Sequence, residues 1–88
     1  MVWYQLFVKT KGEGYPHRQS EMRLIDNALN YHGVFIVSSE LGPIKGEDGT
    51  WEVRAPEAEL EYAKNILLNN NLEIVREVVN GNVEIPNQ

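Results

Sequence analysis

The chain has 88 residues, of which 42% are hydrophobic and 24% are charged, and it contains no cysteine. These values predict a single soluble domain over residues 1–85 with a frayed tail at 86–88, and they exclude disulfides and cysteine chemistry. The formal net charge of −5 argues against a general nucleic-acid or anionic-membrane binder. The sequence contains no apolar run near the ~20 residues of a membrane span and no signal-peptide pattern, so we expect a cytoplasmic protein.

The first half of the chain predicts a strand, a loop and a helix. Trp3 to Thr10 is aromatic and β-branched, which is typical of a strand. A loop over Lys11 to Gln19 follows, interrupted by two glycines and a proline. Ser20 is expected to cap a helix over 21–32, because its hydroxyl can accept a backbone N–H, and Gly33 is expected to end it. The apolar side of this helix is formed by Met22, Ile25, Leu29 and His32.

The middle of the chain predicts a hairpin. Val34 to Ser39 begins with four residues that are apolar on both faces, which favours a covered strand. The turn-rich stretch 40–49 ends in Asp48-Gly49, a pair that supports a tight turn. Residues 50–55 then alternate between apolar and polar side chains, as in a strand with one buried and one wet face.

The last part predicts a helix and a strand. Pro56 fits the first helical position, where its missing N–H costs nothing. The inner stripe of this helix is Leu60, Ala63 and Leu67. Three asparagines break the helix before a strand over 72–79, and residues 83–85 form a possible extra edge strand. The order β-α-β-β-α-β predicts an α+β, ferredoxin-like fold with two helices on one face of a four-stranded antiparallel sheet.

The negative charge is concentrated in the second half of the chain. Residues 1–46 hold five basic and four acidic side chains, whereas residues 47–88 hold three basic and nine acidic ones. The first loop is locally basic and leads into a helix N-terminus, which favours anions. A phosphate or carboxylate site is therefore one hypothesis, and the alternative is an ordinary solvated connector. The candidate ligand-binding residues are Gly12, Gly14, Tyr15, His17 and Arg18.

Each prominent loop or helix residue also has a structural interpretation. His17 could contact a phosphate or act as a general acid or base, whereas His32 suits a capping position at a helix C-terminus. Tyr15 could dock on a partner or pack against the domain itself. Neither histidine has a second ligand at a metal-binding spacing, so we expect no metal and no cofactor.

The uncovered face of the sheet is the second candidate site. Helices on one face leave the other face to water or to a partner, and both predicted faces are more apolar than a solvated face needs. The simplest partner is another copy of the chain, which would make a homodimer. The candidate interface residues are Trp3, Phe7, Phe35 and Trp51. An RNA-binding sheet is disfavoured, because residues 50–55 lack the required aromatic motif.

The chain is similar to the acylphosphatase family in element order over most of its length. The stretch from Gly12 to Arg18 resembles that family's phosphate loop, and residues 49–57 resemble its hairpin leading into the second helix. The resemblance implies an acyl phosphate hydrolase with Arg18 as the phosphate clamp. The sequence departs from the pattern, since Pro16 and His17 separate the glycines from Arg18. Ser38-Ser39-Glu40 stands where the family has its water-positioning asparagine, and without it the hydrolysis lacks a water-orienting group.

Together these patterns favour a small non-enzymatic binding or regulatory module. It is expected to self-associate through its sheet and to bind an anionic small ligand or a protein partner, with the first loop as the ligand contact. The enzyme alternative is the acylphosphatase-like hydrolase.

Overall fold

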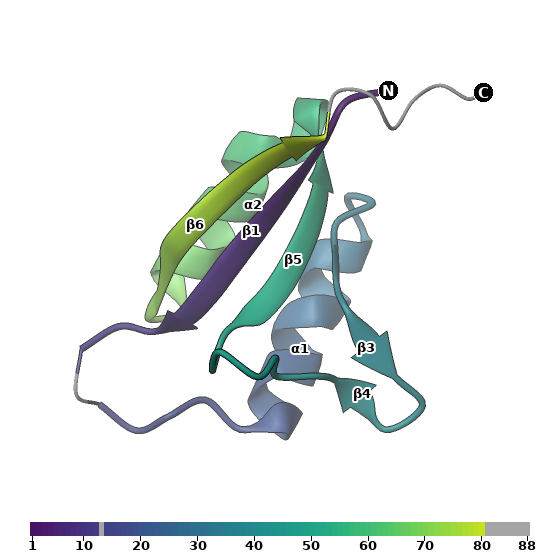
Figure 1. Cartoon of the computed structure of the whole chain (residues 1–88). Helices are drawn as coiled ribbons and strands as arrows, with labels where there is room; N and C mark the ends of the chain where they lie inside the picture. The colour runs from purple at the N-terminus through teal and green to yellow at the C-terminus, as the bar shows by residue number, and fades with distance from the viewer. Residues whose placement is uncertain (13, 81–88) are drawn as a thin grey trace.

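The computed structural model describes residues 1–12 and 14–80. The chain forms two layers, a sheet and a pair of helices that lie behind it in the view of Figure 1. The architecture is α+β, and the main sheet has four antiparallel strands in the order β2-β5-β1-β6. The predicted strand at 83–85 and the tail at 86–88 lie outside the described residues.

The centre of the sheet is formed by β1 (Trp3–Thr10), between β5 (Trp51–Pro56) and β6 (Leu72–Asn80). The strand predictions for these three segments are confirmed to within one residue at each end. Opposite β1, β6 carries a bulge where the register shifts between Phe7 and Val8. The bulge places one extra β6 residue opposite β1 and changes which β6 side chains face the helices.

Helix α1 (Gln19–Asn30) begins two residues earlier than predicted. The prediction of Ser20 as the cap is wrong, because Arg18 is the N-cap and Ser20 lies in the first turn. The backbone N–H of Arg18 donates to Glu21 Oε1 at 3.0 Å, so the Glu21 carboxylate provides a hydrogen-bond partner for the N-cap residue. Gly33 has a φ of +73°, the left-handed conformation predicted beyond the helix end.

Helix α2 (Leu60–Asn69) is preceded by the 3₁₀ turn η1 (Glu57–Glu59). The prediction that Pro56 opens this helix is therefore wrong, since Pro56 is the last residue of β5 and pairs with Trp3. The extended φ and ψ of Pro56, −68° and 152°, fit the end of a strand.

The prediction of one strand over 34–39 is also wrong. The structure splits it into β2 (Phe35–Ile36) in the main sheet and β3 (Ser38–Ser39), which pairs with β4 (Gly42–Pro43) in a separate two-stranded sheet. Gly42 has a φ of +117°, which glycine adopts readily and other residues rarely do. The backbone N–H of Val37 still donates to the Glu52 carbonyl oxygen at 2.8 Å, and beyond it the chain leaves the main sheet, so the edge strand is short.

The core lies between the helices and one face of the sheet. It includes Met22, Ile25 and Leu29 of α1 and Ala63 and Leu67 of α2, as the helical spacings predict. The strands contribute Leu6 and Val8 of β1, Trp51, Val53 and Ala55 of β5, and Leu72 of β6.

Trp51 corrects the predicted interface. Trp51 was predicted to lie with Trp3 and Phe7. In the structure it pairs with Val8, and because directly opposite residues share a face, it lies on the core side of the sheet. Trp51 is buried, with only 4% of its surface exposed. Lys45 Nζ lies 5.5 Å from the centre of the Trp51 ring.

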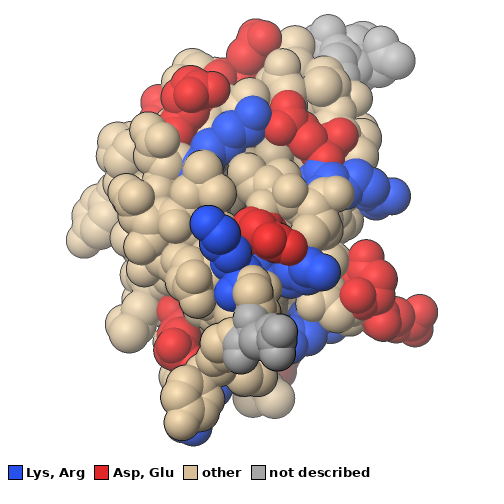
Figure 2. Space-filling view, turned by 90° about the vertical axis from the view of Figure 1, so that its left-hand side faces the viewer, with Lys and Arg blue, Asp and Glu red and all other residues tan. Residues whose placement is uncertain are grey.

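Around β6, acidic and basic side chains alternate over the surface instead of forming separate patches (Figure 2). Lys64 of α2 lies 2.9 Å from Glu77, and Lys9 lies 3.8 Å from Glu73. The hydrogen bond with Glu77 raises the pKa of Lys64. Within the described ranges, we find no helix of the length and apolarity that a membrane crossing requires.

Candidate functional site: the open face of the sheet

We define the open face as the side of the main sheet that points away from the two helices. Alternation along β1 places Trp3, Gln5, Phe7 and Lys9 there, because Leu6 and Val8 point into the core. Register then adds the residues opposite them, which are Glu52, Arg54 and Pro56 of β5 and Glu73, Arg76, Val78 and Asn80 of β6. Phe35 of β2 pairs with Arg54 and completes the open face.

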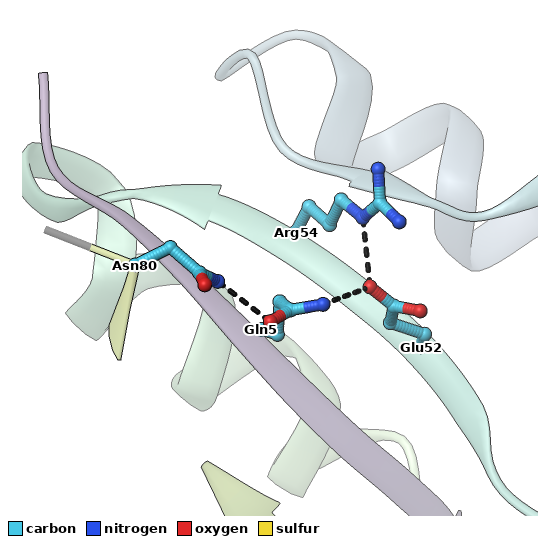
Figure 3. Close-up of polar contacts among 4 residues, drawn as sticks. All are labelled: Gln5, Glu52, Arg54 and Asn80. Carbon is cyan, nitrogen blue, oxygen red and sulfur yellow. Dashed lines mark hydrogen bonds and ion pairs between the residues drawn. The ribbon is translucent and has the colours of Figure 1, made fainter. Parts of the chain in front are cut away.

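Four polar side chains cross the open face as one connected chain (Figure 3). Asn80 Nδ2 donates to Gln5 Oε1 at 2.6 Å, and Gln5 Nε2 donates to Glu52 Oε2 at 2.8 Å. Arg54 Nε donates to the same Glu52 oxygen at 2.7 Å. Three strands are thus linked through side chains, which fixes the orientation of each group.

The Glu52 carboxylate is the centre of this chain. Burial raises its pKa, but the hydrogen bonds from Arg54 and Gln5 outweigh burial, and the Arg76 charge adds to them. The pKa of Glu52 therefore lies below its usual value, and the side chain is ionised at neutral pH.

Aromatic rings surround the polar chain. The rings of Trp3 and Phe35 meet edge to face, with centroids 6.1 Å apart. The Arg76 guanidinium lies 4.2 Å from the centre of the Phe7 ring, a cation–π contact. A hollow of about 380 Å³ lies at one corner of this face, lined by Trp3, Tyr4, Gln5, Phe35, Arg54 and Asn80. Three of the four predicted interface residues, all but Trp51, are therefore together on one surface.

In the first loop, His17 has a structural role. Its Nε2 lies 2.8 Å from the carbonyl oxygen of Asn70, and since a carbonyl only accepts, Nε2 carries the proton. Its Nδ1 lies 2.7 Å from Thr10 Oγ1, which also accepts the His17 backbone N–H at 2.9 Å. Both ring nitrogens are engaged in tying the loop to β1 and to the end of α2.

The other predicted loop residues lie at the surface of the protein. Tyr15 is 91% exposed, and Gly14 and Arg18 are also exposed. Gly12 has a φ of +70°, and the neighbouring Lys11 N–H donates to the carbonyl oxygen of Asn71 at 2.9 Å. Tyr15 and His17 line one hollow of about 480 Å³ together with Glu21, Leu24, Ile25, Asn70 and Asn71, whereas Gly12, Gly14 and Arg18 are not among its lining residues. The charged side chain that lines this hollow is the Glu21 carboxylate, which does not favour an anion there.

The sequence analysis did not identify Gln5, Glu52, Arg54 and Asn80 as site residues. The alternation of residues 50–55 placed Glu52 and Arg54 on a wet face, and Gln5 interrupts an apolar strand. These were the only features of the sequence that pointed to polar residues on this face. The strand register is needed to show that Gln5, Glu52, Arg54 and Asn80 meet.

No group of three or more histidine, cysteine, aspartate or glutamate side chains in residues 1–12 and 14–80 is arranged to hold a metal ion. Comparison with protein-family models, with curated proteins and with solved structures found no significant match.

Proposed function

We propose that the chain is a small non-enzymatic binding or regulatory module that associates with a second copy of itself through the open face. The observation that carries the proposal is a set of three rings on the side of the sheet opposite both helices, the half-buried Trp3 and Phe7 and the exposed Phe35. Aromatic residues are enriched at the centres of protein interfaces, and homo-oligomers are the commonest soluble assemblies.

Charge supports a second copy as the partner. The open face holds three cations, Lys9, Arg54 and Arg76, and two carboxylates, Glu52 and Glu73, whereas the whole chain carries a net charge of −5. When two copies meet at this face, cations of one copy can lie against carboxylates of the other. The acidic surfaces outside the open face then stay apart. Contact through a surface that carries the acidic excess would set acidic groups against each other.

The size of the face supports a weak dimer. The strands β1, β5 and β6 have six to nine residues, and together with the two-residue β2 they span at most roughly 20 Å by 20 Å at a spacing of about 4.8 Å. Two such faces bury on the order of 1,000 Å² of accessible surface, which is the lower bound for a specific interface. We therefore expect a dissociation constant of about 1–100 μM.

The hydrodynamic test of this proposal uses the wild-type chain. Sedimentation equilibrium between about 1 μM and 1 mM should fit a monomer–dimer equilibrium, in line with the expected dissociation constant. A chain that sediments as a monomer over the whole range would overturn the proposal.

We also propose that the fold is ferredoxin-like. The antiparallel order β2-β5-β1-β6 and the placement of both helices on one face support this assignment, with the β3–β4 hairpin as an addition.

The acylphosphatase-like alternative has less support in the geometry. Both ring nitrogens of His17 are engaged, and the Glu21 carboxylate already accepts the backbone N–H of Arg18, the residue that the resemblance assigns as the phosphate clamp. We expect the wild-type chain and Arg18→Ala to leave acetyl phosphate hydrolysis at the buffer rate in a hydroxylamine assay. Turnover by the wild type that disappears in Arg18→Ala would replace the binding module with the hydrolase.

A further inference from the structure

The hollow on the open face combines a cation with an aromatic wall. Arg54 donates its Nε–H to Glu52, and Figure 3 draws no contact from its two terminal nitrogens to the other labelled residues. The terminal nitrogens of a guanidinium form a planar fork that matches the two oxygens of a carboxylate. Arg54 is therefore held in place by one hydrogen bond and presents a second binding edge.

The local charge favours an anion even though the chain is acidic. Glu52 is the carboxylate next to Arg54, and its Oε2 accepts from both Arg54 and Gln5. Arg76 is close enough to Glu52 to help lower the pKa of that carboxyl. Arg54 is the one charged side chain that lines the hollow, whereas Arg76 lies farther along the sheet, over the Phe7 ring.

The aromatic wall limits the shape of the ligand. Trp3 and Phe35 form the edge-to-face pair, and Phe35 is 36% exposed. The hollow of about 380 Å³ is near the small end of ligand pockets, which range over roughly 300–1,000 Å³. It has room for a ligand of one ring, whose face can pack against these side chains.

We propose that this hollow binds a small planar carboxylate, with the carboxylate on the terminal nitrogens of Arg54 and the ring against Trp3 and Phe35. This site lies on the sheet and is separate from the first loop, where the sequence predicted an anion. Every group in it belongs to one chain, and because Trp3 and Phe35 also lie in the proposed dimer contact, the ligand and a second copy compete for this surface.

Benzoate is the probe, and the two tryptophans provide an internal control. In ¹H–¹⁵N spectra each indole N–H gives one peak, from Trp3 in the hollow and from Trp51 in the core. We expect benzoate to shift the Trp3 peak with a millimolar dissociation constant and to leave the Trp51 peak in place. Benzamide, which has the same shape and no charge, should bind at least about tenfold more weakly, because charge-assisted hydrogen bonds are the strong ones.

Two matched variants locate the carboxylate. Arg54→Gln should weaken benzoate binding at least about tenfold, whereas Arg18→Gln, the same change in the first loop, should alter it less than about twofold. Equal binding of benzamide, loss of binding in Arg18→Gln alone, or no shift of Trp3 up to about 10 mM benzoate would each overturn the proposal. Benzoate is titrated at a chain concentration below the dissociation constant of the dimer, where the monomer predominates, and self-association is measured without benzoate, so failure of the dimer and failure of this site are seen separately.

Discussion

Replacing Leu6 by alanine is expected to lower the free energy of unfolding by about 2–5 kcal/mol. Leu6 is 0% exposed and lies at the centre of the sheet, between Val53 of β5 and Glu77 of β6, beneath the helices. Alanine at this position loses buried apolar surface and leaves a cavity that neighbouring strands cannot close. Since small domains are stable by only about 5–15 kcal/mol, the variant should be close to unfolding.

Urea denaturation followed by circular dichroism measures this effect. Wild type and variant are compared at one protein concentration, because self-association also stabilises the folded chain. Leu41→Ala is the matched control, since Leu41 is exposed, and it should change the free energy of unfolding by less than about 0.5 kcal/mol. A loss below about 1 kcal/mol for Leu6→Ala would contradict the placement of Leu6 in the core.

Replacing Phe7 by lysine is expected to weaken self-association about 30-fold or more. Phe7 lies near the middle of the open face, opposite Glu52 on one side and Arg76 on the other. Buried aromatic residues at interface centres typically contribute about 2 kcal/mol or more, which corresponds to this factor. The substitution makes the net charge less negative, so the loss does not come from the acidic surfaces outside the open face; it combines the missing ring with a cation added to a face that already holds three.

The control for Phe7→Lys changes the charge in the same way on another surface. Leu24 lies on the outer side of α1 and is 70% exposed, so Leu24→Lys should leave the dissociation constant within about twofold in sedimentation velocity. Unchanged near-ultraviolet circular dichroism, to which the buried Trp51 contributes, verifies that Phe7→Lys is folded. If Leu24→Lys dissociates the protein and Phe7→Lys does not, the contact surface is α1 and the open face is excluded.

Much of the fold could be predicted from local patterns. Helical spacing identified Met22, Ile25 and Leu29 as core, and alternation identified Trp51, Val53 and Ala55 as one buried face. The predicted first residues of the helices were less accurate. Backbone conformation decides whether Ser20 or Arg18 is the N-cap of α1, and in the structure Glu21 accepts the backbone N–H of Arg18.

The main error was in joining strands that are distant in the sequence. Shifting the register of a strand by one residue moves all its side chains to the other face, and the sequence contains nothing that fixes Val8 opposite Trp51. Trp51 was therefore assigned to the open face. The chain from Asn80 through Gln5 and Glu52 to Arg54 escaped prediction for the same reason, since its members meet only once the three strands are in register.

The first loop shows a second limit of sequence reasoning. Glycines, a histidine and an arginine before a helix are typical of anion sites, yet the same residue types also anchor loops. The hydroxyl of Thr10 and the carbonyl of Asn70 engage His17. The Asn70 carbonyl is 53 residues away in the chain, so its contact with His17 could not be predicted from local spacing.

The central claim is that the open face is the contact between two copies of the chain, and isotope-filtered nuclear Overhauser spectroscopy tests it most directly. Equal amounts of ¹³C-labelled and unlabelled chain are mixed at a concentration above the dissociation constant. We predict intermolecular contacts to the ring protons of Trp3, Phe7 and Phe35. Intermolecular contacts confined to Leu24 and other residues of α1, or none from the open face, would contradict it.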